Sequence, residues 1–149
     1  MRIYLDICCF NRPFDDQSQL LIRLQTEAKL YIQEAIRQGI YDLVWSGVMD
    51  LENLANPDEE RREAIGDWKA LATVKVVTDN QVEAVAEELA LLGVKPMDAL
   101  HAASAIIAST DWLLTTDRAL LRKMHGHPRL RVGDPIDFIR TLREIHHEN

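Results

Sequence analysis

The chain has 149 residues, enough for one domain whose core needs neither disulfides nor a structural metal. A hydrophobic content of 47% with 28% charged residues is typical of a globular protein in water, and no apolar run approaches the ~20 residues of a membrane span. The net charge of −7 does not favour a nucleic-acid partner, and the N-terminus lacks the pattern of a signal peptide, so we expect a cytoplasmic protein.

Strand and helix patterns alternate along the chain. After the first strand, the segment around Pro13 is expected to form a loop, because proline interrupts a helix. Strands are predicted over residues 1–6, 41–45, 73–77, 112–117 and 130–132. Helices are predicted from the loop to Gln38, between Ser46 and Pro57, over 58–72, between Thr78 and Gly93, over 97–109 and 118–124, and from Asp134-Pro135 onward.

Capping and breaking residues set the expected ends of these helices. Ser46 and Thr78 are predicted N-caps, because their hydroxyls accept from backbone N–H groups of the first turn. Gly39 and Gly93 are natural stops, and Pro96 prefers the first helical position. Candidate N-caps for the first long helix are Asp15, Asp16 and Ser18. Apolar residues on one face of that helix, expected to pack inward, are Leu21, Leu24, Ala28, Tyr31, Ile32 and Ala35.

Strands separated by helices require crossover connections, which produce a mostly parallel sheet covered on both faces. The sequence contains no internal repeat and no low-complexity linker. We therefore predict an α/β fold formed by a single domain over residues 1–149.

Charge is distributed unevenly along the chain. Residues 118–149 contain seven Lys or Arg and four Asp or Glu, a net charge of +3, so residues 1–117 carry −10. The same segment holds four of the five histidines. This pattern is either a weak electrostatic footprint for a polyanion or simply a solvated face.

Four acidic residues have the placement that a metal-dependent nuclease requires. Asp6 and Asp117 end predicted strands, whereas Glu52 and Asp98 fall on apolar helical segments, where a carboxylate is costly unless compensated. In an α/β fold, strand ends and helix starts meet at one edge of the sheet. A carboxylate cluster there would bind a hard cation such as Mg²⁺.

Each acid also has a purely structural explanation. Asp6 and Asp117 could cap the helices that follow their strands, and Asp98 could interact with a helix dipole. Glu52 is harder to explain in this way, because it lies within the apolar stripe of its helix and has no local Lys or Arg partner. The stripe is formed by Val48, Leu51 and Ala55. The joint placement of all four acids is what favours a metal site.

Four segments resemble the signature blocks of the PIN-domain nucleases, which include the VapC-like toxin ribonucleases. They are Tyr-Leu-Asp6, Ser46-Gly-Val-Met-Asp-Leu-Glu52, Pro96-Met-Asp98-Ala-Leu-His-Ala-Ala and Leu-Leu-Thr-Thr-Asp117. The resemblance spans essentially the whole chain and implies a PIN-like three-layer α/β/α fold. It further implies an endoribonuclease that uses Mg²⁺ or Mn²⁺, forms a homodimer and is the toxin of a toxin–antitoxin pair, restrained by a small antitoxin protein.

The resemblance implies catalytic and metal-binding roles for Asp6, Glu52, Asp98 and Asp117. We expect Asp6 and Asp98 to be direct ligands, Asp117 to bind directly or through water, and Glu52 to hold a second ion or position the attacking water. His101, one helical turn after Asp98, is expected to be a packed neighbour of the site. Possible RNA contacts, chosen because they adjoin the acids, are Asn11, Arg12, Arg118, Arg122 and Lys123.

The chain departs from the family pattern after the first acid. Many members continue with a small hydroxyl residue, whereas this chain continues Ile7-Cys-Cys-Phe. We expect Cys8 and Cys9 to be reduced and buried just past the first strand.

Two other functions remain open from the sequence. One is a catalytically inactive PIN-like domain that binds RNA or protein, which the intact acid set argues against. The other is an Mg²⁺-dependent phosphatase, a class that uses an Asp-x-Asp pair after the first strand. The chain has Asp6-Ile-Cys8 there, so the second acid is missing.

Overall fold

A computed structural model of the chain describes residues 1–11 and 15–148. Five parallel strands form its central sheet in the order β3-β2-β1-β4-β5, which confirms the predicted α/β class. The strands are β1 (Arg2–Leu5), β2 (Asp42–Ser46), β3 (Val74–Val76), β4 (Trp112–Leu114) and β5 (Arg131–Gly133). The last strand lies at an edge of the sheet, as predicted.

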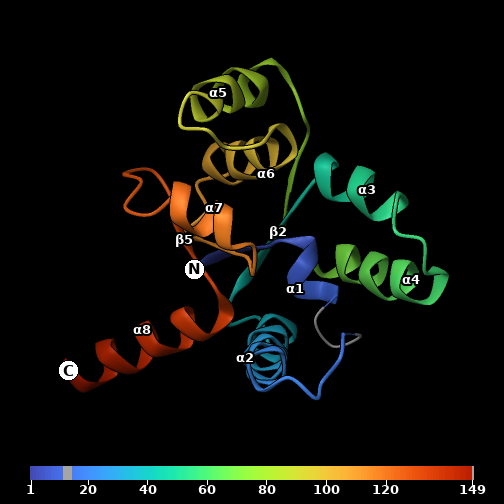
Figure 1. The fold of residues 1–149 in the computed structure, drawn as a ribbon, viewed down its shortest axis with the longest axis vertical. Helices are drawn as coiled ribbons and strands as arrows, with labels where there is room; N and C mark the ends of the chain where they lie inside the picture. Colours follow the sequence, from blue (N-terminus) through green and yellow to red (C-terminus); the bar gives the residue numbers. More distant parts are fainter. Residues whose placement is uncertain (12–14, 149) are drawn as a thin grey trace.

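Helices connect the strands. They are α1 (Ile7–Asn11), α2 (Leu20–Arg37), α3 (Gly47–Leu54), α4 (Glu59–Trp68), α5 (Asn80–Ala90), α6 (Pro96–Ile107), α7 (Arg118–Lys123) and α8 (Pro135–Glu148), with a short 3₁₀ helix η2 (Lys69–Leu71). Figure 1 shows α5 and α6 side by side beyond one side of the strands, and α2 with α8 beyond the other. The fold is therefore a three-layer α/β/α arrangement.

The centre of the sheet is the core of the protein. Ile3, Tyr4 and Leu5 of β1 and Leu113 and Leu114 of β4 are essentially inaccessible to solvent. Alternate residues of one strand point to opposite faces, so both faces of β1 must be covered by helices. Full burial of such a side chain stabilises the fold by about 1.5–3 kcal/mol. None of the helices in the described part of the chain is both long and apolar enough to cross a membrane.

Most helix ends follow the predicted signals. The Ser46 hydroxyl accepts from the backbone N–H of Met49 at 3.2 Å and caps α3, and Pro96 is at the start of α6. Gly39 follows α2 with φ +76°, a conformation that glycine adopts without strain. The predicted Thr78 cap is wrong, because the carboxylate of Asp79 caps α5 instead.

Two predictions about the first long helix are also wrong. Helix α2 begins after Gln19, whose side chain makes no capping bond, so Asp15, Asp16 and Ser18 are not its N-caps. Leu21, Leu24 and Tyr31, expected to face the core, are exposed. The buried residues of α2 are Gln25, Thr26, Lys29, Ile32, Gln33, Ala35 and Ile36. The apolar spacing is thus helical, but the stripe that it marks lies largely at the surface.

Candidate metal centre

The site begins where β1 and β4 end. These two strands are paired at the centre of the sheet, and the backbone N–H of Asp6 continues the pairing by donating to Leu114 O at 2.9 Å. Asp6 directly follows β1, and Asp117 lies three residues beyond β4. Parallel pairing therefore brings two acids that are 111 positions apart to the same edge of the sheet.

Helices α3 and α6 bring the other predicted acids to this edge. Glu52 lies on α3, which follows β2, and Asp98 lies in the first turn of α6. The two helices contact each other, although they are separated by more than 40 residues of chain. All four predicted acids thus lie at the carboxyl edge, contributed by four different segments.

Asp6 is held by a dense set of donors. Its side chain accepts from the backbone N–H of Ile7 at 2.8 Å and from the hydroxyl of Thr115 at 2.9 Å. The thiol of Cys8 lies 3.4 Å from the same carboxylate. Asp6 is only 5% exposed, and these bonds replace the water that a buried carboxylate loses. The orientation of Asp6 is therefore fixed by the protein itself.

Thr115 connects the first and last acids. Its hydroxyl donates to Asp6 and accepts from the backbone N–H of Asp117 at 3.1 Å. Cys8 completes the link, because its sulfur lies 3.4 Å from the Thr115 hydroxyl and accepts from the N–H of Thr116 at 3.2 Å. Cys8 thus packs beside Asp6 in the segment where the chain departs from the family pattern.

His101 is the centre of a buried hydrogen-bond chain. Its Nδ1 lies 2.5 Å from the hydroxyl of Tyr4, which is 2.6 Å from the hydroxyl of Ser46. Its Nε2 is hydrogen-bonded to the carboxylate of Glu52 and lies 3.9 Å from Asp6 Oδ1. One histidine thus connects the core of the sheet to two of the predicted acids.

Potential ligand atoms of Asp6, Glu52 and His101 all lie within 4.8 Å of one another. Asp98 and Asp117 are outside this compact cluster. Asp117 is the N-cap of α7, and its Oδ1 accepts from Ala119 N at 2.9 Å and from Leu120 N at 3.2 Å. The structural explanation considered for Asp117 is therefore correct, and it leaves the second carboxylate oxygen outside the cap.

The charges of the site act on one another. Burial and the nearby charges of Asp6 and Asp117 raise the pKa of Asp98 above its ordinary value. For His101, burial lowers the pKa, but the hydrogen bond to Glu52 and the charges of Asp6 and Glu52 outweigh burial and raise it. Both shifts indicate an excess of negative charge that would be relieved by a cation.

The donor set fits a hard divalent cation. Mg²⁺ and Mn²⁺ prefer carboxylate oxygens, whereas an imidazole ligand is more typical of zinc, copper, iron or nickel. The imidazole Nε2 is already hydrogen-bonded to Glu52. The carboxylates of Asp6, Glu52, Asp98 and Asp117 would therefore hold the ion, and His101 would orient Glu52.

Sequence reasoning missed the partners of the acids. Among the described residues, Glu52 makes no ion pair with Lys or Arg, and His101 supplies its partner. The expected apolar stripe around Glu52 is only partly correct, because Val48 is buried while Leu51 and Ala55 are exposed. Thr115 lies inside a recognised motif, but only the structure shows that its hydroxyl links Asp6 to Asp117.

The predicted RNA contacts are dispersed around the site. Arg118 and Arg122 are exposed on α7 and line an open depression of about 410 Å³, and Lys123 follows them at the end of the helix. Asn11, at the end of α1, accepts a hydrogen bond from the side chain of Asn56 at 3.4 Å. Arg12 lies outside the described residues.

Known structures share this fold at low sequence identity. The chain is similar to proteins in the crystal structures of FitAcB from Neisseria gonorrhoeae (15% identity, TM-score 0.60) and of VapBC2 from Rickettsia felis bound to a DNA fragment from their promoter (15% identity, TM-score 0.59). In each case the match covers 90% of this chain and 98% of the other. A third similar structure is DNA-bound VapBC from Salmonella typhimurium, with 18% identity, TM-score 0.56 and coverage of 91% and 98%.

Among curated protein sequences, none matches this chain significantly. The sequence itself does match a family model, the PIN domain, over residues 3–125. That match spans β1 to the end of α7 and includes Asp6, Glu52, Asp98 and Asp117. The chain therefore belongs to the PIN domain family, the nuclease family that its four acidic motifs resemble.

Proposed function

We propose that this protein is an endoribonuclease that hydrolyses RNA phosphodiester bonds with Mg²⁺ or Mn²⁺ held by Asp6, Glu52, Asp98 and Asp117. The observation that carries the proposal is the convergence of these acids at the carboxyl edge of the sheet, where Asp6 and Glu52 form a compact cluster with His101. The raised pKa of Asp98 supports it, because burial and like charges favour protonation when no cation is present.

A divalent ion in this site would supply positive charge for the phosphate oxygens and make water easier to deprotonate. The protein supplies orientation. Thr115 and the N–H of Ile7 fix Asp6, and His101 fixes Glu52. In this scheme Asp6 and Asp98 bind the ion, Glu52 positions the attacking water or a second ion, and Asp117 contributes from the start of α7.

Basic side chains beside the acids would hold the RNA. Arg118 and Arg122 project from α7, the helix that Asp117 caps, and both are exposed. Phosphate contacts from Lys and Arg supply much of the affinity of nucleic-acid-binding proteins without reading the base sequence. We assign the same role to Lys123, Asn11 and Arg12.

We further propose that the protein is the toxin of a toxin–antitoxin pair in the cytoplasm, bound by a small antitoxin protein, and that it forms a homodimer. Two of the similar structures are VapBC proteins bound to DNA, which supports a partner of that kind. The exposed apolar side chains of α2 also support protein contacts, since large exposed apolar patches commonly mark interfaces. These side chains are Leu20, Leu21, Leu24, Leu30 and Tyr31.

The proposal is tested by RNA cleavage assays in Mg²⁺, Mn²⁺ and EDTA. The wild type should cleave only with a divalent ion, and Asp6→Asn and Asp98→Asn should abolish cleavage, because asparagine keeps the shape but loses the charge that binds the ion. Asp67→Asn, on the exposed surface of α4, is the matched control and should cleave normally. Wild-type protein that binds RNA but never cuts it would instead indicate an inactive RNA-binding domain.

A further inference from the structure

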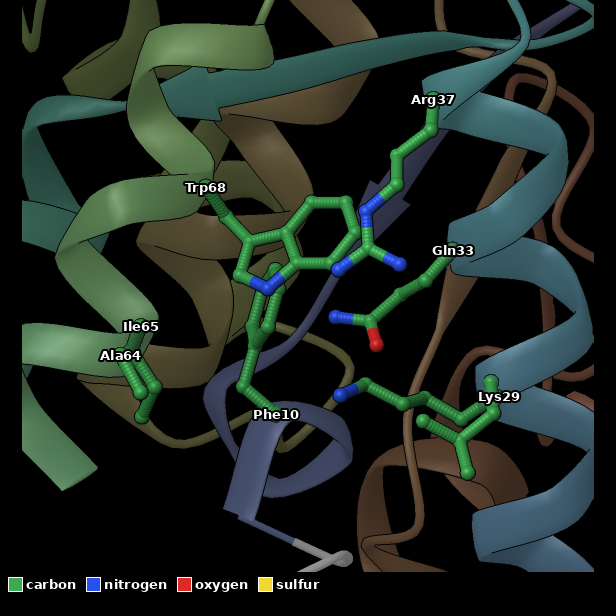
Figure 2. Close-up of a pocket in the computed structure, with 8 residues that line it drawn as sticks. Phe10, Lys29, Gln33, Arg37, Ala64, Ile65 and Trp68 are labelled. Carbon is green, nitrogen blue, oxygen red and sulfur yellow. The ribbon is translucent and has the colours of Figure 1, made fainter.

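A pocket whose lining includes none of the four acids lies between α1, α2 and α4. It has a volume of about 170 Å³. Phe10 of α1 and Trp68 of α4 form its aromatic wall, with ring centroids 6.3 Å apart, and α2 supplies the facing side. Figure 2 shows the nitrogen atoms of Lys29, Gln33 and Arg37 turned toward this wall. We call it the Lys29 pocket.

The three nitrogen-bearing side chains are spaced along one face of α2, four residues apart, so they share that face. Lys29 is only 4% exposed and Gln33 only 3%. The Lys29 ammonium lies 5.3 Å from the centre of the Phe10 ring, and the Arg37 guanidinium lies 4.7 Å from the centre of the Trp68 ring. The pocket is thus a preformed set of donors held against aromatic rings.

The donors of the pocket are incompletely used. Within the described part of the chain, the side-chain amide nitrogen of Gln33 is buried and has no hydrogen-bond partner. The Lys29 ammonium makes no ion pair with any described carboxylate, and Arg37 is paired only with Glu34, at 3.4 Å on the exposed surface. The buried Gln33 amide would therefore gain a hydrogen bond from an acceptor in the pocket, and Lys29 and the exposed Arg37 would gain a counter-ion.

The electrostatics point to an anion. Burial, together with the positive charge of Arg37, lowers the pKa of Lys29 from 10.5 to about 8, although the nearby Cys9 acts in the opposite direction. None of the described residues that line the pocket is acidic. The chain as a whole has a net charge of −7, but the pocket is locally positive, because Lys29 and Arg37 line it.

We propose that the Lys29 pocket binds a phosphate group through the Lys29 ammonium, the Gln33 amide and the Arg37 guanidinium. Three separate donor side chains match the three acceptor oxygens of a phosphate better than the two oxygens of a carboxylate. The volume is below the roughly 300–1,000 Å³ of pockets that enclose a drug-sized ligand, so the pocket takes the phosphate and not a whole nucleotide.

The phosphate has two possible sources, a free phosphate ion or a phosphodiester of RNA. The RNA source rests on the proposed nuclease function. It is supported by the position of Phe10, which lies on the short helix that starts directly after Asp6. Four residues of helix span about 6 Å, so one strand could reach both the acids and the pocket around α1.

The test is thermal unfolding in EDTA, where phosphate cannot bind through a divalent ion at the acids. Phosphate should raise the melting temperature of the wild type more than sodium chloride at equal ionic strength. Lys29→Met and Arg37→Gln should each weaken the phosphate affinity at least tenfold, and Arg23→Gln, a cation removed from the exposed face of the same helix, should not. Equal effects of phosphate and chloride on the wild type, or undiminished phosphate affinity in both pocket variants, would overturn the proposal.

RNA binding measured by fluorescence anisotropy in EDTA identifies the source. If the phosphate belongs to RNA, Arg37→Gln should lower the affinity for a single-stranded oligonucleotide and reduce the salt slope by about 0.7 for the lost contact. If only free phosphate binds, the variant should lose phosphate affinity while its RNA affinity stays unchanged. Neither measurement requires cleavage. Both therefore test phosphate binding in the Lys29 pocket even if the protein proves not to cleave RNA.

Discussion

The Nε2 atom of His101 is hydrogen-bonded to the carboxylate of Glu52, although the two residues lie 49 positions apart in the chain. The other ring nitrogen, Nδ1, is hydrogen-bonded to the hydroxyl of Tyr4, and this hydroxyl is also hydrogen-bonded to the hydroxyl of Ser46. The ring therefore cannot turn without breaking bonds at both ends. This series of hydrogen bonds fixes the orientation of the Glu52 carboxylate relative to Asp6. His101 therefore acts as a positioning residue for the acid cluster.

Replacing His101 should weaken the site without removing any acid. In His101→Leu, Glu52 loses its partner, and loss of such an orienting bond typically costs 10–100-fold in metal affinity or activity. His101→Gln, which keeps an amide donor, should retain more of both. Mn²⁺ titration and RNA cleavage measured on the same preparations test this. Wild-type metal affinity in a folded His101→Leu protein would show that Glu52 needs no orientation.

Ser46 should matter more for stability than an ordinary surface hydroxyl. Its side chain caps α3 through Met49 N and shares a hydrogen bond with the buried Tyr4 hydroxyl. Ser46→Ala should lower the free energy of unfolding by about 1–3 kcal/mol, combining the lost cap with a weakened buried bond. Thr78→Ala is the control, because Asp79 and not Thr78 caps α5. Chemical denaturation should show the smaller loss for Thr78→Ala, and equal losses would contradict the assignment.

Asp98→Asn should stabilise the metal-free protein, the opposite of the usual effect of changing a partly buried residue. Burial and the charges of Asp6 and Asp117 disfavour the ionised form of Asp98, as its raised pKa shows. A neutral amide removes that repulsion, and about 0.5–1 kcal/mol is expected for a partly solvent-screened charge interaction. Unfolding in EDTA at neutral pH measures it. Asp67→Asn should change the stability by less than about 0.5 kcal/mol.

Because Lys29 is buried, the free energy of unfolding should rise as the solution becomes mildly alkaline. Its pKa is lowered from 10.5 to about 8 in the folded protein, so between these values the unfolded chain binds more protons and stability increases with pH. The full shift corresponds to about 3 kcal/mol. Lys29→Met has no group at this position that titrates. The free energy of unfolding of the wild type should therefore rise relative to that of Lys29→Met as the pH rises from 8 toward 10.5. A difference between the two proteins that is independent of pH would contradict the buried charge.

Much of the fold could be predicted because the sequence patterns are local. Alternating strand and helix signals require crossovers, and crossovers require a parallel sheet whose strand ends share one edge. That reasoning alone places Asp6 and Asp117 together. It cannot supply the rotation of a helix about its own axis, which depends on what packs against it. Helix α2 therefore exposes Leu24 and Tyr31, which were expected to face the core, and buries Lys29 and Gln33, whereas Ile32 and Ala35 are buried as expected.

The details of the site depend on contacts between distant residues. Glu52 was conspicuous in the sequence as a carboxylate on an apolar helix without a local cation. Its partner is a histidine on α6, and no sequence spacing encodes the approach of α3 to α6. Asp117 illustrates the converse case, because the helix cap that sequence reasoning offered as an alternative is present in the structure. The cap uses only Oδ1 of Asp117, so its other carboxylate oxygen is free of the cap and could contribute to the proposed metal site.

The most direct test of the central claim is the melting temperature of the wild type in EDTA and in millimolar Mn²⁺. An ion that binds only the folded protein adds about 2.7 kcal/mol of stability at 100 times its dissociation constant. For a chain of 149 residues, each kcal/mol corresponds to roughly 2–4 °C. We expect a rise of several degrees for the wild type and none for Asp98→Asn. Coincident unfolding curves of the wild type in EDTA and Mn²⁺ would show that the four acids are not a metal site.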